Sequence, residues 1–431
     1  MKKKLNTVSA FQLYQLVRYA TLILIGIVFT KTALSQSAIG EYETFVFIAG
    51  AVSFFWLNGL LKALLPLSAQ KDKTNIFSAF VVIQILSVLV ALLLFLLQPF
   101  FSQHLLNGKE IPEIGILVIF LVFGVPANLV EYFYLIKKRN SAIIIYASVS
   151  FLIQFLFVVL PAVFGYGIIF ALKGLVAASV FRYIWLWIIL ISNSEIQFSF
   201  SFVKEHLKLG APLVAATFLS GSAQFVDGFI VTSKFNEETF AVFRYGAREL
   251  PLAMLLANAL SNAMLPDFAR KENLKSNLVK LKSSVSKLMH FLFPVTAVLL
   301  LVSHPIFPVV FNAQFEKSAS IFNIYLLLVI SRLIMPQTIL NGIKITKPIM
   351  KASFFELILN VAFSLILVEY FGIAGIAYAT FIAYYFEKIY LAIVVQNKLK
   401  IAVSEYLPLR IYALYSFGIV FIFIFAEIIF N

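Results

Sequence analysis

Long apolar runs separated by short polar segments follow one another along almost the whole chain. A helix that crosses a bilayer needs about 20 mostly apolar residues, and backbone groups in hydrocarbon must be paired within the segment itself. The runs therefore predict membrane-spanning helices. They cover residues 11–33, 43–69, 75–101, 113–136, 142–164, 167–192, 207–233, 239–266, 284–310, 318–343, 349–369, 372–396 and 407–430.

The composition strengthens this prediction. Hydrophobic residues make up 61% of the chain and charged residues only 13%, whereas soluble domains are about 45–50% apolar and about 25% charged. We therefore expect an all-α, polytopic membrane helix bundle of about 12–14 helices. The chain has no cysteine, and its four histidines lack metal-ligand spacing, so we expect neither disulfides nor a metal site.

Loop charge predicts the orientation. If the N-terminus is cytoplasmic and the runs alternate, the inside segments carry 22 Lys and Arg residues and the outside loops carry four. Cytoplasmic loops of membrane proteins are enriched in these residues. We expect a multi-pass protein of the cytoplasmic membrane with its N-terminus inside. The bias also explains most of the net charge of +14 without a nucleic-acid partner.

The two halves of the chain show an internal repeat. Leu65-Pro66 and Leu265-Pro266 each precede a Lys-acid pair at the end of an apolar run, and six runs separate them. Six crossings preserve orientation, so the halves would be related by an axis along the membrane normal. We expect two six-helix lobes, 1–200 and 201–400, and an extra C-terminal transmembrane helix in 401–431. Chance likeness of apolar segments is the alternative.

Charged residues within the runs are candidates for function, because a charge at the bilayer centre costs roughly 2.5–3.5 kcal/mol. Arg244 and Arg248 lie four residues apart, on one helical face. The planar guanidinium suits phosphate, so the pair could bind an anion. The alternatives are pairing with Glu249 or another acid, or extension to the membrane surface.

Acids within the runs are candidates for ion coupling. Asp227 follows Thr217, Ser220 and Gln224 at spacings that form a polar stripe on one helical face. A buried acid on such a stripe could relay a proton or cation, or it could form a seam between helices or pair with an arginine. Glu131 is the second coupling candidate.

Other charged positions are less distinctive. Arg18 forms a polar patch in the first run, Arg332 lies deep in the tenth, and Lys62 could reach the membrane surface. Arg182, beside Tyr183 and Trp185, is typical of an interfacial aromatic belt. We expect Glu356 and Glu387 to be structural, because they lie near the ends of runs or beside Lys388.

The sequence does not indicate an enzyme. It contains no phosphate-binding glycine loop, no H-E-x-x-H and no G-x-S-x-G, so we expect no catalytic residue and no cofactor. The connections between runs are too short to form a catalytic domain. A membrane glycan polymerase, which would be expected to have a sizeable outer loop, is disfavoured for this reason.

Several segments resemble polysaccharide flippases of the multidrug/oligosaccharidyl-lipid/polysaccharide exporter (MOP) superfamily. Gly210-Ala211-Pro212, Asp227 and the segment 240–246 resemble the seventh and eighth helices of that family. Asn360 with 371–377 resembles its eleventh and twelfth helices, and 40–45 resembles its first outer loop. One departure is the count, since relatives commonly have twelve or fourteen helices and this chain has thirteen runs.

The resemblance implies two lobes that alternate access to a central cavity. The cargo would be an oligosaccharide on a polyprenyl diphosphate, and other polysaccharide assembly proteins could be partners. The cationic residues that match the family's diphosphate-binding cavity are Arg18, Arg244, Arg248 and Arg332, and Asp227 matches its seventh-helix acid. A multidrug cation antiporter and a peptidoglycan-precursor flippase are the alternatives from the same superfamily.

Overall fold

A computed structural model describes residues 7–67, 74–247, 251–269, 273–343 and 345–430. Within these ranges the chain is helical and contains no β-strand. The first half forms α1 (Thr7–Phe29), α2 (Gln36–Leu67), α3 (Thr74–Leu96), α4 (Gln98–Leu105), α5 (Ile114–Gly124), the 3-10 helix η1 (Pro126–Asn128), α6 (Leu129–Ile136), α7 (Asn140–Val163), α8 (Ile168–Asn193) and α9 (Phe200–Gly221).

The second half continues the helical pattern. It forms α10 (Ala223–Lys234), α11 (Glu237–Gly246), α12 (Pro251–Ala269), α13 (Leu274–Val310), the 3-10 helix η3 (Ala313–Phe315), α14 (Lys317–Leu326), α15 (Leu328–Arg332), α16 (Pro336–Gly342), α17 (Lys347–Phe371), α18 (Ile373–Leu399), α19 (Val403–Tyr406) and α20 (Leu409–Phe430). Every apolar run of the sequence therefore coincides with helix, as predicted.

Several of the predicted crossings consist of more than one helix. The interrupted runs are 75–101, 113–136, 207–233, 239–266 and 318–343. Among the described residues, ten helices are long and apolar enough to cross a bilayer, and α14–α15 with α16, bent by 49°, would make an eleventh. The protein is a multi-pass membrane protein, and thirteen crossings stay a prediction.

Exposed side chains agree with a lipid environment. On α20, the side chains of Phe417 and Phe421 are 78% and 71% exposed. Tyr370, at the end of α17, is 79% exposed. Soluble monomers rarely leave contiguous apolar surfaces of this kind uncovered, whereas a bilayer solvates them.

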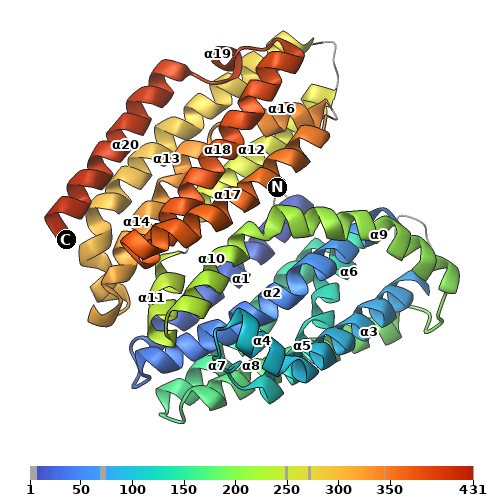
Figure 1. The fold of residues 1–431 in the computed structure, drawn as a ribbon. Helices are drawn as coiled ribbons and strands as arrows, with labels where there is room; N and C mark the ends of the chain where they lie inside the picture. The colour runs from blue at the N-terminus through green and yellow to red at the C-terminus, as the bar shows by residue number, and fades with distance from the viewer. Residues whose placement is uncertain (1–6, 68–73, 248–250, 270–272, 344, 431) are drawn as a thin grey trace. The chain divides into compact units, whose positions relative to one another are not determined.

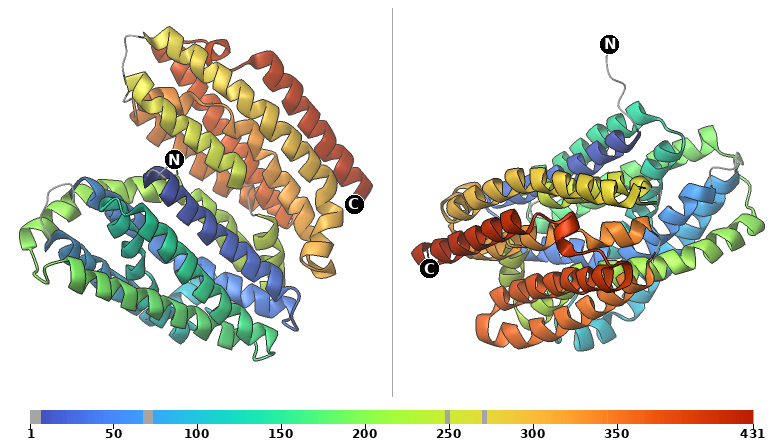
Figure 2. Two further views of the ribbon diagram at one scale, coloured as in Figure 1. Left: turned by 180° about the vertical axis from the view of Figure 1, so that it is seen from behind. Right: turned by 90° about the horizontal axis from the view of Figure 1, so that it is seen from above.

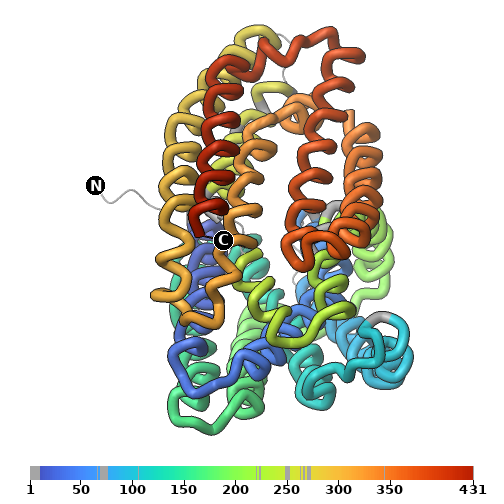
Figure 3. Tube along the Cα trace, turned by 60° about the vertical axis from the view of Figure 1, so that its left-hand side comes forward, coloured from blue at the N-terminus to red at the C-terminus, as the bar shows by residue number. Residues whose placement is uncertain are grey.

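The helices form two units. Unit 1 contains Met1–Gly221 and Thr232–Ala241, and unit 2 contains Ser222–Val231 and Val242–Asn431. These limits differ from the division expected at residue 200, because α9 packs along α2 within unit 1 (Figure 1). In unit 2, α20 runs along α13 (Figure 2) and α17 pairs with α18 (Figure 3). The extra C-terminal helix predicted in 401–431 corresponds to α20, which belongs to unit 2.

A short segment of unit 1 comes from the second half of the sequence. This segment, Thr232–Ala241, joins the end of α10 to α11. The Lys109 ammonium donates hydrogen bonds to the backbone carbonyl of Thr232, at 2.6 Å, and to that of Phe235. At Gly40 a Cβ would lie 2.0 Å from the carbonyl oxygen of Glu237, so only glycine permits this close approach.

Candidate functional site

Four helices of unit 1 place charged and phenolic side chains in one buried cluster, which we call the Arg182 cluster. Its members are Tyr14 of α1, Glu131 of α6, Tyr146 of α7 and Arg182 of α8. The Tyr14 hydroxyl donates a hydrogen bond to Glu131 Oε2. The nearest guanidinium nitrogen of Arg182 lies 4.0 Å from the same oxygen, and Arg182 Nε donates to the Tyr146 hydroxyl at 3.0 Å.

The Arg182 cluster corrects one prediction. Arg182 was expected in an interfacial aromatic belt, but it is 8% exposed and its guanidinium lies 5.7 Å from the centre of the Phe151 ring. A buried guanidinium requires a counter-charge and hydrogen bonds, which Glu131 and Tyr146 supply. The flanking aromatic residues therefore reflect packing within the unit.

Arg18 adds a second cation to this region. It lies one helical turn after Tyr14 on α1, is half-buried, and interacts electrostatically with Glu131. Two guanidinium groups therefore share one carboxylate, and the three side chains carry a formal charge of +1. An excess positive charge within a membrane protein favours an anionic ligand.

In unit 2, a second buried cluster forms around Asp227, and we call it the Asp227 cluster. Its members are Asp227 of α10, Tyr325 of α14, Asn360 of α17 and Thr380 of α18. The hydroxyls of Tyr325 and Thr380 donate to Asp227 Oδ2 at 2.7 and 2.5 Å. The Asn360 amide donates to the Thr380 hydroxyl at 2.9 Å. Among the described residues, Asp227 Oδ2 is thus held by hydroxyl groups rather than by an arginine.

Three buried oxygens in this part of unit 2 have no hydrogen-bond partner among the described residues. They are Asp227 Oδ1, Asn360 Oδ1 and the hydroxyl of Ser364, one turn after Asn360 on α17. Buried polar atoms are normally satisfied, so unsatisfied oxygens call for an explanation such as an ion. Carboxylate, amide and hydroxyl oxygens are the ligands that hard cations prefer.

The sequence predicts Asp227 as a functional residue, but it does not identify the side chains that surround it. Asn360 carried part of the family resemblance, whereas Tyr325, Ser364 and Thr380 were not singled out. The spacing of Asn360 and Ser364, four residues apart on one face of α17, was the available signal.

The predicted polar stripe lies on two helices. Thr217 is buried on α9 in unit 1, and Asp227 lies on α10 in unit 2, beyond the interruption at Ser222. The side chains of Ser220 and Gln224 lie outside the described part of the chain. The stripe as a single functional face stays a prediction.

A third group of charged residues lies in unit 2. The Arg332 guanidinium lies 4.7 Å from the centre of the Tyr384 ring and interacts electrostatically with Glu356. Lys388 Nζ lies 2.6 Å from Glu387 Oε2 and 3.2 Å from Gln337 Oε1. Glu387 and Lys388 thus form an ion pair, and the structural role of Glu387 stays a prediction.

The remaining predicted anion ligands belong to neither of the two buried clusters. Arg244 is half-buried on α11, whereas Arg248 lies outside the described residues. Lys62 is exposed on α2 in unit 1. The anion-binding role of these residues stays a prediction.

Comparison with known proteins gives a family and a fold. Residues 32–320, well over half of the chain, match the family described as polysaccharide biosynthesis protein. No curated protein is significantly similar in sequence. Among solved structures, lipid II flippase MurJ in an inward closed conformation has a TM-score of 0.70 and 18% identity, with 97% of each chain covered.

Two further structures have similar folds. An inward-facing multidrug resistance MATE family transporter of the MOP superfamily has a TM-score of 0.65 and 15% identity, over 88% of this chain and 94% of that chain. A MOP superfamily transporter from Pyrococcus furiosus has a TM-score of 0.54 and 14% identity, over 91% and 93% of the respective chains. At these identities the likeness shows a shared fold.

Proposed function

Because the chain belongs to the polysaccharide biosynthesis protein family, we propose that it flips a polyprenyl-diphosphate-linked oligosaccharide, a surface polysaccharide precursor, across the cytoplasmic membrane. Its fold and family are those of MOP superfamily membrane transporters and flippases rather than enzymes. The family match is the observation that carries this choice of cargo. Transport would proceed by alternating access.

The distribution of charge supports an anionic headgroup. Arg182 and Arg18 share the Glu131 carboxylate, which leaves one formal positive charge in this region. In unit 2, Arg332 and Arg244 supply further guanidinium groups, which bind phosphate oxygens through two parallel hydrogen bonds. We assign Arg18, Arg244, Arg248, Arg332 and Lys62 to the diphosphate.

The Asp227 cluster supports coupling to a cation. Asp227 Oδ1 on α10 and the two unpaired oxygens on α17 would hold a proton or a monovalent cation between these two helices of unit 2. A proton or cation bound to Asp227 would change its hydrogen bonds with Tyr325 and Thr380. It would thereby shift the equilibrium between the conformations of the transport cycle. Glu131 is a weaker candidate, because Arg182 and Tyr14 already occupy its carboxylate.

A translocation assay tests the cargo. Proteoliposomes would contain a fluorescent polyprenyl-diphosphate oligosaccharide, and the amount that reaches the opposite leaflet would be measured. We expect Arg18→Ala and Arg332→Ala to reduce transport at least tenfold, since a hydrogen bond to a charged group contributes about 1.5–3 kcal/mol. Lys173→Ala in unit 1 and Lys351→Ala in unit 2 remove exposed cations and serve as matched controls.

The outcomes of this assay distinguish an error in the assigned binding residues from an error in the assigned cargo. If Arg18→Ala and Arg332→Ala both transport the oligosaccharide lipid at the wild-type rate, these arginines do not bind the diphosphate. The proposed cargo would still stand. Transport of a peptidoglycan precursor in place of the oligosaccharide would make the protein a flippase for that lipid. Export of cationic drugs alone would make it a multidrug antiporter.

A further inference from the structure

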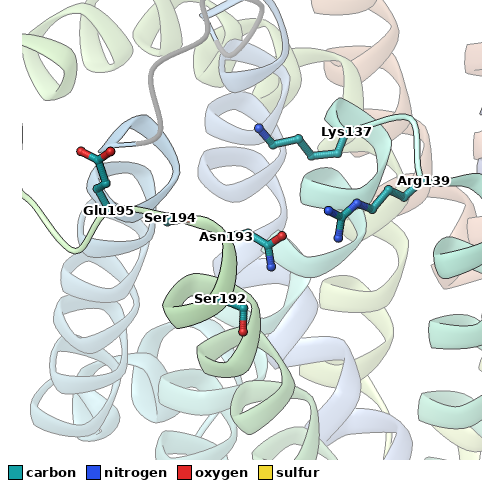
Figure 4. A pocket seen from close by; sticks show the side chains of 6 residues that line it. All are labelled: Lys137, Arg139, Ser192, Asn193, Ser194 and Glu195. Carbon is teal, nitrogen blue, oxygen red and sulfur yellow. The ribbon is translucent and has the colours of Figure 1, made fainter.

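A pocket lies at one end of unit 1, apart from both buried clusters. It has a volume of about 340 Å³ and is lined by Lys137, Arg139, Ser192, Asn193, Ser194 and Glu195 (Figure 4). This volume lies in the range of about 300–1,000 Å³ that is usual for small-ligand sites. The lining comes from the turn between α6 and α7 and from the last turn of α8 with the two residues that follow it.

The turn between α6 and α7 fixes the two cations of the pocket. Lys138 has a left-handed φ of 53°, and its N–H bonds to the carbonyl of Leu135 at 3.1 Å. The N–H of Arg139 bonds to the carbonyl of Tyr134 at 2.9 Å. This pair of bonds is a Schellman ending of α6, in which glycine usually occupies the left-handed position. Lys137 and Arg139 flank that position, and both line the pocket.

The cationic side chains of the pocket have no anionic partner in the described part of the chain. Neither Lys137 nor Arg139 forms a salt bridge or a side-chain hydrogen bond there; Arg139 only lies 6.0 Å from the centre of the Phe133 ring. In Figure 4, the Arg139 guanidinium extends toward Asn193, the Lys137 side chain runs above it, and the Glu195 carboxylate lies at the far side of the pocket. The pocket therefore presents two positive charges that Glu195 does not neutralise.

A second polar group of the pocket is also unsatisfied. The Ser194 hydroxyl is shielded from solvent and has no hydrogen-bond partner among the described residues. Because this oxygen has no access to solvent, it does not face the open space of the pocket. The positive charge of Lys137 and Arg139 is therefore the feature that a ligand would meet.

We propose that this pocket binds the phosphate of an anionic phospholipid headgroup. It lies at the ends of membrane-spanning helices, at the side that loop charge predicts to be cytoplasmic, where anionic lipids meet basic residues. Arg139 supplies a planar fork for two phosphate oxygens and Lys137 supplies a point charge. The proposal goes beyond the proposed transport function, because it concerns a resident lipid rather than the cargo.

The polyprenyl phosphate of a cargo lipid shares this chemistry, so the experiment has two arms. The full-length protein would be released from nanodiscs of phosphatidylcholine with phosphatidylglycerol, or with polyprenyl phosphate, and its bound lipids counted by native mass spectrometry. Lys137→Gln and Arg139→Gln are the test variants. Lys138→Gln is the matched control, because it removes an equal charge from the same turn but does not line the pocket.

We expect Lys137→Gln and Arg139→Gln each to weaken phosphatidylglycerol binding about fivefold, which is the contribution of one basic residue at an anionic surface. Lys138→Gln should change it less than twofold. An equal loss in all three variants would mean that general loop charge attracts the lipid and would overturn the proposal. Unchanged binding in the pocket variants, or retention of polyprenyl phosphate without phosphatidylglycerol, would overturn it as well.

Discussion

The hydroxyl of Tyr14 donates a hydrogen bond to the carboxylate of Glu131, which lies 117 residues further along the chain. The same carboxylate oxygen faces the guanidinium of Arg182 at 4.0 Å. The first helix of unit 1 is thereby joined to the buried ion pair between α6 and α8. Because Glu131 and Arg182 are both buried away from water, each charge is stabilised mainly by the other.

This dependence predicts the effect of removing one charge. Glu131→Leu leaves Arg182 buried without its counter-ion and should lower the free energy of unfolding by about 3 kcal/mol. The measurement is unfolding of the purified protein in mixed micelles with increasing denaturing detergent. The double variant Glu131→Leu with Arg182→Leu is the control and should regain most of the stability, because it removes both charges. If the double variant is as unstable as the single one, the ion pair is not the cause.

The Asp227 cluster predicts that one substitution separates coupling from folding. Asp227→Asn keeps an oxygen that can accept from Tyr325 and Thr380, but it removes the charge that a cation requires. We expect the variant to fold while transport loses its dependence on a sodium or proton gradient. The readout is headgroup translocation with each gradient imposed in turn.

A second acid in unit 2 provides the control for Asp227. Glu356→Gln also removes a buried carboxylate, but from the group around Arg332. It should leave the ion dependence unchanged. If translocation by Asp227→Asn still depends on the ion gradient and translocation by Glu356→Gln does not, Glu356 rather than Asp227 is the coupling residue.

Close packing between α7 and α8 predicts a steric effect. At Gly174 a Cβ would lie 1.9 Å from the carbonyl oxygen of Phe157, so Gly174→Ala must push two backbones apart. Overpacking of this kind costs about 1–3 kcal/mol, and it should appear as a lower midpoint of thermal unfolding. Gly418→Ala, on α20 where a Cβ would meet nothing within 4 Å, should not lower the midpoint and should raise it slightly, because Ala is more stable than Gly inside a helix by about 0.5–1 kcal/mol. Equal midpoints for the two variants would show that α7 and α8 can separate without loss.

The helices could be predicted from the sequence because the bilayer imposes a length and an apolar composition on each run. Asp227 and Glu131 could also be foreseen as unusual, since an acid in an apolar run is costly unless it has partners. The partners themselves could not be foreseen. Thr380 lies 153 residues from Asp227, and no local pattern reports a contact of that range.

Arg182 illustrates how a local pattern can mislead. Aromatic neighbours beside a cation are typical of the membrane interface, and the same composition also occurs where aromatic rings pack around a buried guanidinium. Only the position of α6 against α8, which brings Glu131 to Arg182, decides between the two environments. Both residues can be read from the sequence, but their contact in the folded protein cannot.

The orientation and the number of crossings can be tested directly, because the chain contains no cysteine. Single cysteines would be introduced at exposed positions and labelled in intact cells with a maleimide that does not cross membranes. With a cytoplasmic N-terminus, Lys317→Cys should be labelled from outside, and Lys138→Cys should be labelled only after permeabilisation. The reverse pattern would invert the orientation derived from loop charge.

The same method decides whether α20 crosses the membrane. Lys398 and Phe430 lie on either side of this helix, and both side chains are exposed. Thirteen crossings place Lys398→Cys inside and Phe430→Cys outside, so the two labels should respond oppositely to permeabilisation. If α20 does not cross, both positions lie on the same side. An equal response would therefore assign α20 to the membrane surface, although its 22 mostly apolar residues are long enough to span the bilayer.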